Sequence, residues 1–207
     1  NYDAINKILI KNKILAPKLY QENYQKNYIE IEDFGKDTIF TILKKNKKNN
    51  FFYFRKIIKT LNQIQLIKNT KIKNFKKKRF YVSKYNREIL IKEADLFCDW
   101  YIKNFSIKNK NLFTKKFKSI VRKLTLNLKL KNNTFVHRDF HVSNLMLVNN
   151  QIGVIDSQDA LIGNKAYDLA SLIDDVRFKT SISLKNRIYK LYVRNQKKFE
   201  KQKFKND

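Results

Sequence analysis

The amino-acid sequence predicts an α+β fold, in which a short segment of strands and one helix precedes a mainly helical part. Two observations favour this fold class. Residues 28–32 alternate between polar and apolar side chains, which is the period of a β-strand. From Phe51 onward the apolar residues recur at the spacing of amphipathic helices. Because the period changes near residue 45, we expect one unit at 1–45 and a second at 46–207.

The first unit is expected to contain a helix and two strands. A helix is predicted at 4–14, where apolar residues recur at helical spacing, and Pro17 disfavours helical backbone just before it. Strands are predicted at 19–23 and 28–32. A turn at 33–35 follows the second strand.

Three amphipathic helices are expected in the second unit, each with one apolar stripe. Trp100 and Cys98 belong to the apolar pattern of the middle helix, and we expect both in the core. The lysine-rich run at 71–79 is expected to be a solvated loop. The stripes comprise Phe54, Ile57, Ile58, Leu61 and Ile64; Leu90, Ala94, Phe97 and Tyr101; and Phe113, Phe117, Ile120, Val121, Leu124 and Leu128.

Short strands then interrupt the helices. They are predicted at 134–136, 145–148 and 151–155, and Asn149 with Asn150 supplies a two-residue hairpin turn between the last two. Two further helices are predicted, beginning near Ala166 and near Leu184.

The composition restricts the class of protein. The chain has 46 Lys and Arg against 18 Asp and Glu, a net charge of +28. Such an excess can indicate a nucleic-acid partner, but it is spread over a chain rich in Lys, Asn, Ile, Phe and Tyr. The codons of these residues are mostly A and T, so genome composition explains the charge and we expect no specific nucleic-acid partner. Nothing in the pattern favours one oligomeric state.

The apolar content of 43% argues against disorder. No apolar run is long enough for a membrane span, and no signal peptide opens the chain. The single cysteine fits a reducing compartment. We therefore expect a cytoplasmic protein without a membrane span.

The residues that carry chemistry are concentrated between His137 and Asp168. Asp139 is followed by Asn144, then by a hairpin whose second strand ends in Asp156. Phosphoryl transfer needs a carboxylate that meets the incoming hydroxyl and oxygen ligands that hold Mg²⁺ against the phosphates. The hairpin returns the chain to Asn144, so we predict Asp139 as the catalytic base and Asn144 and Asp156 as the magnesium ligands.

The stretches HRDFHVSNLM and GVIDSQDALIGNKAYDLASLIDD resemble the catalytic core of the aminoglycoside phosphotransferase and choline kinase superfamily. Within it, the chain is most similar to anomeric kinases for N-acetylmuramate and N-acetylglucosamine in cell-wall recycling. The segments YIEIEDFG and YNREILIKEADLFCDWY share this similarity.

The resemblance implies a protein-kinase-like bilobal fold, with an incomplete small lobe at 1–45 and a mainly helical large lobe at 46–207. It implies ATP and Mg²⁺ as cofactors and a small-molecule sugar as the acceptor, phosphorylated on its anomeric hydroxyl. The hinge that binds adenine would be formed by Glu30, Ile31, Glu32 and Phe34.

The chain also departs from the family pattern. The nucleotide loop and the strand lysine are expected upstream of Asn1, and the last helices beyond residue 207, so we expect the 207-residue chain alone to be nearly inactive. Ser157 occupies a position where the family usually has an aromatic residue.

Several residues are candidates for the acceptor site. Glu93 and Asp159 are expected to reach the sugar. Arg138 would either contact the substrate or form a local salt bridge, and His141 would either line the sugar pocket or stabilise a turn.

Two further residues are expected to be structural. We expect His137 to hydrogen-bond the backbone near Asp156, and Asp168 to accept hydrogen bonds from the catalytic-loop backbone.

Two alternatives remain open. One is another small-molecule kinase of the superfamily, acting on an aminoglycoside, choline or another alcohol. The other is a non-catalytic basic binding module. A protein kinase is disfavoured because IDSQ replaces the DFG motif.

Overall fold

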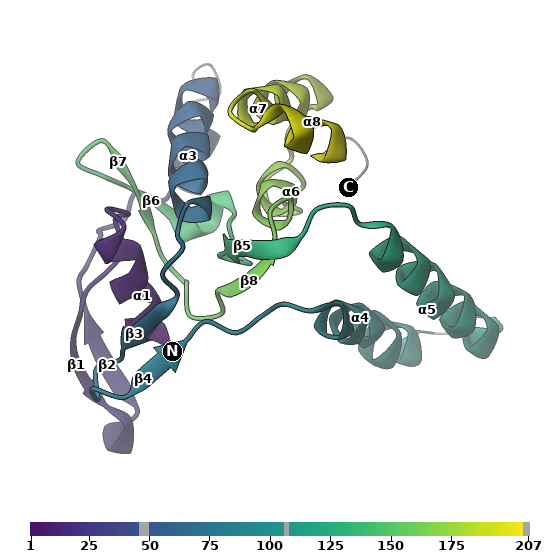
Figure 1. Ribbon diagram of the computed structural model, residues 1–207, viewed down its shortest axis with the longest axis horizontal. Helices are drawn as coiled ribbons and strands as arrows, with labels where there is room; N and C mark the ends of the chain where they lie inside the picture. The colour runs from purple at the N-terminus through teal and green to yellow at the C-terminus, as the bar shows by residue number, and fades with distance from the viewer. Residues whose placement is uncertain (46–49, 106–107, 205–207) are drawn as a thin grey trace.

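A computed structural model describes residues 1–45, 50–105 and 108–204 of the chain (Figure 1). Its helices are α1 (Tyr2–Lys11), α2 (Ile39–Lys45), α3 (Asn50–Gln65), α4 (Arg87–Leu96), α5 (Lys110–Asn127), α6 (Tyr167–Ile173), α7 (Ile182–Arg194) and α8 (Lys198–Phe204). Its strands are β1 (Leu19–Asn23), β2 (Tyr28–Ile31), β3 (Lys71–Lys73), β4 (Arg79–Tyr81), β5 (Asn132–Val136), β6 (Leu145–Val148), β7 (Gln151–Val154) and β8 (Leu161–Asn164). They form antiparallel two-stranded sheets in the pairs β1–β2, β3–β4, β5–β8 and β6–β7.

The predicted helix and strands near the N-terminus are confirmed. Helix α1 buries the apolar face of Ile5, Ile8 and Leu9, and β1 has the predicted bounds. The helix ends at Lys11, earlier than predicted, because Lys13 adopts a left-handed backbone (φ 60) that leads into the next segment.

One hydrophobic cluster joins both predicted units. It contains Ile5 and Leu9 of α1, Phe54 of α3, Val154 of β7 and Tyr192 of α7. The expected boundary after residue 45 falls at residues 46–49, which lie outside the described residues.

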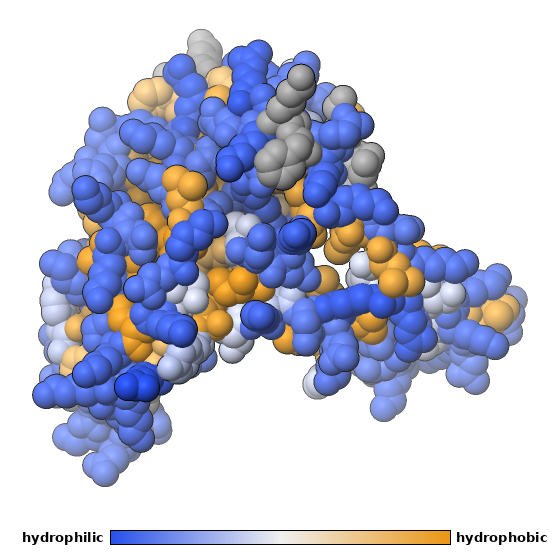
Figure 2. Space-filling view, viewed as in Figure 1, coloured by the Kyte–Doolittle hydropathy of each residue, from blue (hydrophilic) through white to orange (hydrophobic). Residues whose placement is uncertain are grey.

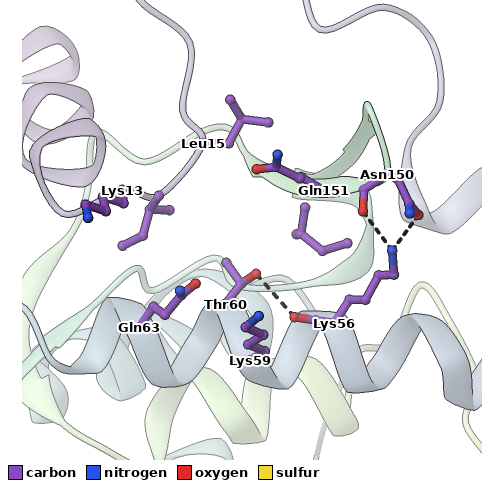
Figure 3. A pocket seen from close by; sticks show the side chains of 10 residues that line it. Lys13, Leu15, Lys56, Lys59, Thr60, Gln63, Asn150 and Gln151 are labelled. Carbon is purple, nitrogen blue, oxygen red and sulfur yellow. Dashed lines mark hydrogen bonds between the residues drawn. The ribbon is translucent and has the colours of Figure 1, made fainter.

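The predicted hairpin β6–β7 is confirmed and is anchored on several sides. Asn149 and Asn150 both have positive φ, 47 and 63, as the predicted two-residue turn requires. Lys56 of α3 donates to the carbonyl and side-chain oxygens of Asn150 (Figure 3). On the strand edges, Val154 N donates to Leu15 O at 2.8 Å. The hairpin is therefore held between α3 and the N-terminal segment.

The prediction that Trp100 packs in the core is wrong, since it is 71% exposed. Helices α4 and α5 contact each other and project from the rest of the molecule (Figure 1), so each apolar stripe has only one neighbouring helix to cover it. Apolar side chains lie among polar ones on the surface of the projecting helices α4 and α5 (Figure 2). A π-helical turn at Phe97–Ile102 also changes the angular register, and Cys98 is buried there as predicted while Trp100 turns to the surface.

The lysine-rich run predicted as a loop instead forms the β3–β4 hairpin. Ile72 pairs with Phe80 and their side chains are half-buried, while the neighbouring lysines point to solvent. Burial of one apolar side chain in each strand therefore stabilises the hairpin despite the surrounding positive charge. Helix α2 and strand β8 were not predicted either, and Gly163 and Asn164 explain the weak strand pattern of β8. Among the described helices, none is long and apolar enough to cross a membrane.

Gly153 gives a test of the hairpin packing. A Cβ at this position would lie 2.8 Å from the Phe34 ring, and the β7 backbone cannot withdraw because it is bonded to Leu15. We expect Gly153→Ala to lower the free energy of unfolding by about 1–3 kcal/mol in urea titrations.

Gly35→Ala is the matched control. Gly35 has φ +78, and a Cβ at this position would have no atom within 4 Å, so only backbone strain of about 1 kcal/mol is expected. A smaller loss at Gly153 than at Gly35 would contradict the packing argument.

Candidate active site

The loop that carries the predicted catalytic base Asp139 begins where strand β5 ends, and its backbone is fixed by one buried carboxylate. His137 N donates to Asp168 Oδ2 at 2.8 Å and Arg138 N donates to Asp168 Oδ1 at 3.0 Å. This confirms the structural role expected of Asp168. Arg138 has φ 76, a conformation that is costly for a residue with a side chain. The two hydrogen bonds therefore stabilise a strained backbone directly before Asp139.

Asp168 is fully buried, and burial raises its pKa to about 7, while the hydrogen bonds from His137 and Arg138 oppose this shift. Both carboxylate oxygens accept from N–H groups, so the geometry stabilises the charged form.

His137 has the structural role that the sequence predicts. Its ring is fully buried, and Nε2 lies 3.1 Å from the carbonyl oxygen of Ile155. A carbonyl only accepts, so Nε2 carries the proton. Burial lowers the pKa of His137 to about 4, although the Ile155 carbonyl and the negative charge of Asp156 act in the opposite direction. His137 is thus neutral at pH 7 and links the catalytic loop to the end of β7.

The two predicted metal ligands are brought together. Asn144 Nδ2 donates to Asp156 Oδ2 at 3.3 Å and to the carbonyl of Asp139 at 3.1 Å. Ile155 N donates to Asn144 O at 3.1 Å. Asp156 has φ 61, and its Oδ1 accepts from Gln158 Nε2 at 2.7 Å. The backbone of Asp139 and the side chains of Asn144 and Asp156 are therefore linked by hydrogen bonds.

This donor set fits a magnesium ion. One amide and one carboxylate supply oxygen ligands, and Mg²⁺ retains waters or phosphate oxygens in its other positions. Within residues 1–45, 50–105 and 108–204, no group of three or more His, Cys, Asp or Glu could hold a metal by itself. The pair therefore suits a cation that arrives with a phosphate ligand.

A cleft of about 550 Å³ joins the predicted hinge to the metal pair. It is lined by Ile31, Glu32 and Phe34 from the hinge and by Asn144 and Asp156. Its remaining lining residues are Tyr2, Pro17, Asp33, Gly35, Met146 and Ile155. Of the predicted hinge residues, only Glu30 is absent from the lining; it pairs with Gln21 in the β1–β2 sheet.

The lining of this cleft contains no lysine or arginine among its described residues, and it carries Glu32, Asp33 and Asp156. Three other cavities each include lysines and none of the predicted site residues. The cavity between α3 and the β6–β7 turn, for example, is lined by Lys13, Lys56 and Lys59 (Figure 3).

Two of the predicted acceptor residues, Glu93 and Arg138, contact each other. Arg138 Nη2 donates to Glu93 Oε1 at 2.6 Å, and the hydroxyl of Tyr85 donates to the other Glu93 oxygen. Burial, followed by the hydrogen bond to Glu93, raises the pKa of Tyr85. Arg138 thus has the local salt bridge that the sequence left open, and its positive charge also interacts with the negative charge of the exposed Asp159. No sequence pattern indicated the role of Tyr85.

His141 lies beside the metal pair. Its Nε2 is 3.4 Å from Asn144 Nδ2, and its buried Nδ1 has no hydrogen-bond partner among the described residues. Burial and the positive charge of Arg177 lower the pKa of His141, whereas Asp175 raises it. The pKa of the buried His141 therefore lies below its ordinary value.

Solved structures share this architecture. An ADP-bound aminoglycoside phosphotransferase, APH(2'')-Ib, matches with a TM-score of 0.63 and 16% identity, covering 95% of this chain and 67% of the other. A choline kinase from Streptococcus pneumoniae matches with a TM-score of 0.61 and 15% identity, covering 96% and 64%. The fold is thus of the kinase-like α+β class.

The chain belongs to the phosphotransferase enzyme family, which residues 45–198 match. It is 36% identical over 96 residues to the N-acetylmuramate/N-acetylglucosamine kinase of Neisseria meningitidis serogroup B, covering 44% of this chain and 28% of the relative. It is 25% identical over 161 residues to the kinase of the same name from Pseudomonas aeruginosa, covering 77% and 44%. The chain spans less than half the length of these relatives.

The buried, neutral His137 predicts a loss of stability in acid. In the unfolded chain its pKa returns to 6.5, whereas the folded chain resists protonation until about pH 4. Between these values the unfolded state binds more protons, so stability decreases as the pH falls through this window. The loss attributable to His137 is about 3 kcal/mol between pH 7 and pH 4.

His137→Gln provides the comparison in urea unfolding at several pH values. The variant should be less stable at pH 7 but should lose less stability on acidification. Equal pH dependence of the two proteins would show that His137 is not buried in its neutral form.

Proposed function

We propose that the full-length protein transfers the γ-phosphoryl group of ATP to the anomeric hydroxyl of an N-acetylated amino sugar, N-acetylmuramate or N-acetylglucosamine. The observation that supports this best is the single cleft that joins the hinge residues to Asn144 and Asp156. The names of the curated relatives support the choice of acceptor. The family resemblance of the sequence further implies a role in cell-wall recycling in the cytoplasm, which we include in the proposal.

The adenine ring would bind at the hinge end of the cleft. Ile31, Phe34 and Met146 offer apolar surfaces for a flat ring, and the Phe34 ring is itself packed against Gly153. The phosphates would extend toward Asn144 and Asp156. Residues 1–45 would then supply the hinge and residues 46–207 the catalytic loop.

Asn144 and Asp156 would hold Mg²⁺, which neutralises charge on the phosphate oxygens when bound. Asp139 would orient the anomeric hydroxyl and accept its proton as the oxygen–phosphorus bond forms and the bond to ADP breaks. Its carbonyl is fixed by Asn144, so the base and the metal ligand are positioned together. The products are ADP and a sugar 1-phosphate.

Charge removal at the two aspartates should have different effects. Asp139→Asn removes the proton acceptor but no metal ligand, so nucleotide binding should persist while turnover falls by roughly 100- to 10,000-fold. Asp156→Asn weakens the metal site, so added Mg²⁺ should partly restore activity. The measurement is the Mg²⁺ dependence of turnover with nucleotide affinity determined in parallel. Restoration of both variants by metal would show that the roles are misassigned.

The acceptor is tested with a panel of N-acetylmuramate, N-acetylglucosamine, glucose, choline and kanamycin, with phosphorus NMR to locate the new phosphate. We expect phosphate on C1 of the N-acetylated sugars. Phosphorylation of choline or kanamycin alone would favour another kinase of the superfamily. No phosphorylation at all would favour a non-catalytic module.

Glu93→Ala should impair sugar use more than nucleotide binding, because it releases Tyr85 and also Arg138, which directly precedes Asp139. We expect at least a tenfold increase in the sugar KM, the effect of losing about 1.4 kcal/mol. Asp95→Ala, on the same helix α4 and paired with Lys118 at 3.4 Å, is the matched control and should leave this KM unchanged. Equal effects would place the acceptor elsewhere.

A further inference from the structure

A chain of buried hydrogen bonds runs behind the metal site. The hydroxyl of Ser157, directly after Asp156, donates to Asn6 Oδ1. Asn6 Nδ2 then donates to the carbonyl oxygen of Pro17 at 2.8 Å. Ser157 is fully buried and Asn6 is 2% exposed. Helix α1 is thereby bonded to two segments that are distant from each other in the sequence.

These polar residues are unusual in their surroundings. Asn6 lies among the buried residues of α1, next to Ile5 and one turn from Leu9. An unpaired amide there would be strongly destabilising, because the apolar surroundings offer it no hydrogen-bond partner. The two hydrogen bonds offset this penalty only if Ser157 and Pro17 keep their positions. The geometry of α1 is therefore coupled to both partners.

The first partner, Ser157, restrains the backbone next to Asp156, the predicted metal ligand. Asp156 has a left-handed backbone, φ 61, and its carboxylate is exposed to the cleft. The hydrogen bond of Ser157 restrains the backbone on one side of Asp156, and the bond between Ile155 and Asn144 restrains it on the other. The backbone dihedrals of Asp156 are therefore fixed. The side chain of Asp156 then leaves the backbone in one direction.

The second partner, Pro17, lies next to the residues of the predicted hinge. Pro17 lines the cleft, and the next residue, Lys18, pairs with the hinge through Glu32 N donating to Lys18 O at 2.9 Å. Lys18 N also donates to Glu32 Oε2 at 3.2 Å. Asn6 thus connects the metal end of the cleft to its nucleotide end.

We propose that Asn6 and Ser157 are positioning residues that set the place of the Asp156 carboxylate relative to the nucleotide hinge. This inference rests on the proposed function, since it assigns a role in metal and nucleotide binding. Neither residue touches the substrate. Each acts through its neighbour, Ser157 through Asp156 and Asn6 through Pro17 and Ser157.

Two variants separate the two connections in the full-length protein. Ser157→Ala removes only the hydroxyl and breaks the connection to Asp156. Asn6→Asp keeps the acceptor for Ser157 but replaces the amide nitrogen that donates to Pro17 with an oxygen. Tyr192→Phe is the matched control, because it removes another buried hydrogen bond, 2.6 Å long to Gln65, away from the cleft.

We expect Ser157→Ala to raise the Mg²⁺ concentration for half-maximal activity by about tenfold, the effect of one lost hydrogen bond. Mn²⁺ binding in the presence of ADP, followed by electron paramagnetic resonance without an acceptor, should weaken equally. Asn6→Asp should weaken ADP binding as well. In the metal-free protein, amides 155–158 should exchange with deuterium faster in both variants. Tyr192→Phe should lower thermal stability without changing the Mg²⁺ dependence of activity, the binding of Mn²⁺ and ADP, or the deuterium exchange of these amides.

The outcomes distinguish a failure of this inference from a failure of the proposed function. If the wild-type protein binds Mn²⁺ and ADP but Ser157→Ala shows the same affinities and exchange as Tyr192→Phe, the hydrogen-bond chain is only structural and the inference is wrong. If the wild-type protein binds neither, the proposed function fails and the inference fails with it. Ser157→Ala is the decisive variant because it removes a single atom and leaves the surrounding packing in place.

Discussion

The buried carboxylate of Asp168 is the interaction on which the rest of the site depends. It holds the N–H groups of His137 and Arg138, and therefore the left-handed backbone at Arg138 that directly precedes Asp139. Asn144 bonds to the carbonyl of Asp139 and to the side chain of Asp156, so each functional group is positioned by the one before it. A carboxylate without N–H donors at this depth would be strongly destabilising, and this is why the loop and Asp168 constrain each other.

The β6–β7 hairpin places Asn144 and Asp156 at one end of a cleft. Its strand edges are bonded to the N-terminal segment, through Val154 N to Leu15 O and through Leu147 N to Asp37 O. Residues on either side of the predicted boundary at 45 therefore line the same space. Gly153 allows the Phe34 ring to approach the strand, which a side chain at that position would prevent. The hinge and the metal pair face one another because one hairpin contacts both.

The sequence predicted what local chemistry or the family resemblance determines, and it missed a local change of helical register and a contact between distant residues. The Asn149 and Asn150 turn and the bonds of Asp168 followed from local chemistry and a family resemblance. The burial of Trp100 was predicted wrongly because a π-helical turn alters the register of an apolar stripe without any change in composition. The bond from Ser157 to Asn6 joins residues 151 positions apart, so no period or spacing along the chain could indicate it.

Charge gives a further reason to locate metal chemistry in this cleft. In a chain with 46 Lys and Arg against 18 Asp and Glu, most surface cavities acquire lysines, as that of Figure 3 does. The described lining of the cleft beside Asn144 and Asp156 has none and carries three acidic residues. Asp156 is held by the amides of Asn144 and Gln158, which orient its carboxylate without cancelling its charge. A lysine at either position would compete with a divalent cation for the same oxygens. Neutral donors around Asp156 therefore leave its negative charge available to Mg²⁺, as the proposed function requires, within a strongly positive protein.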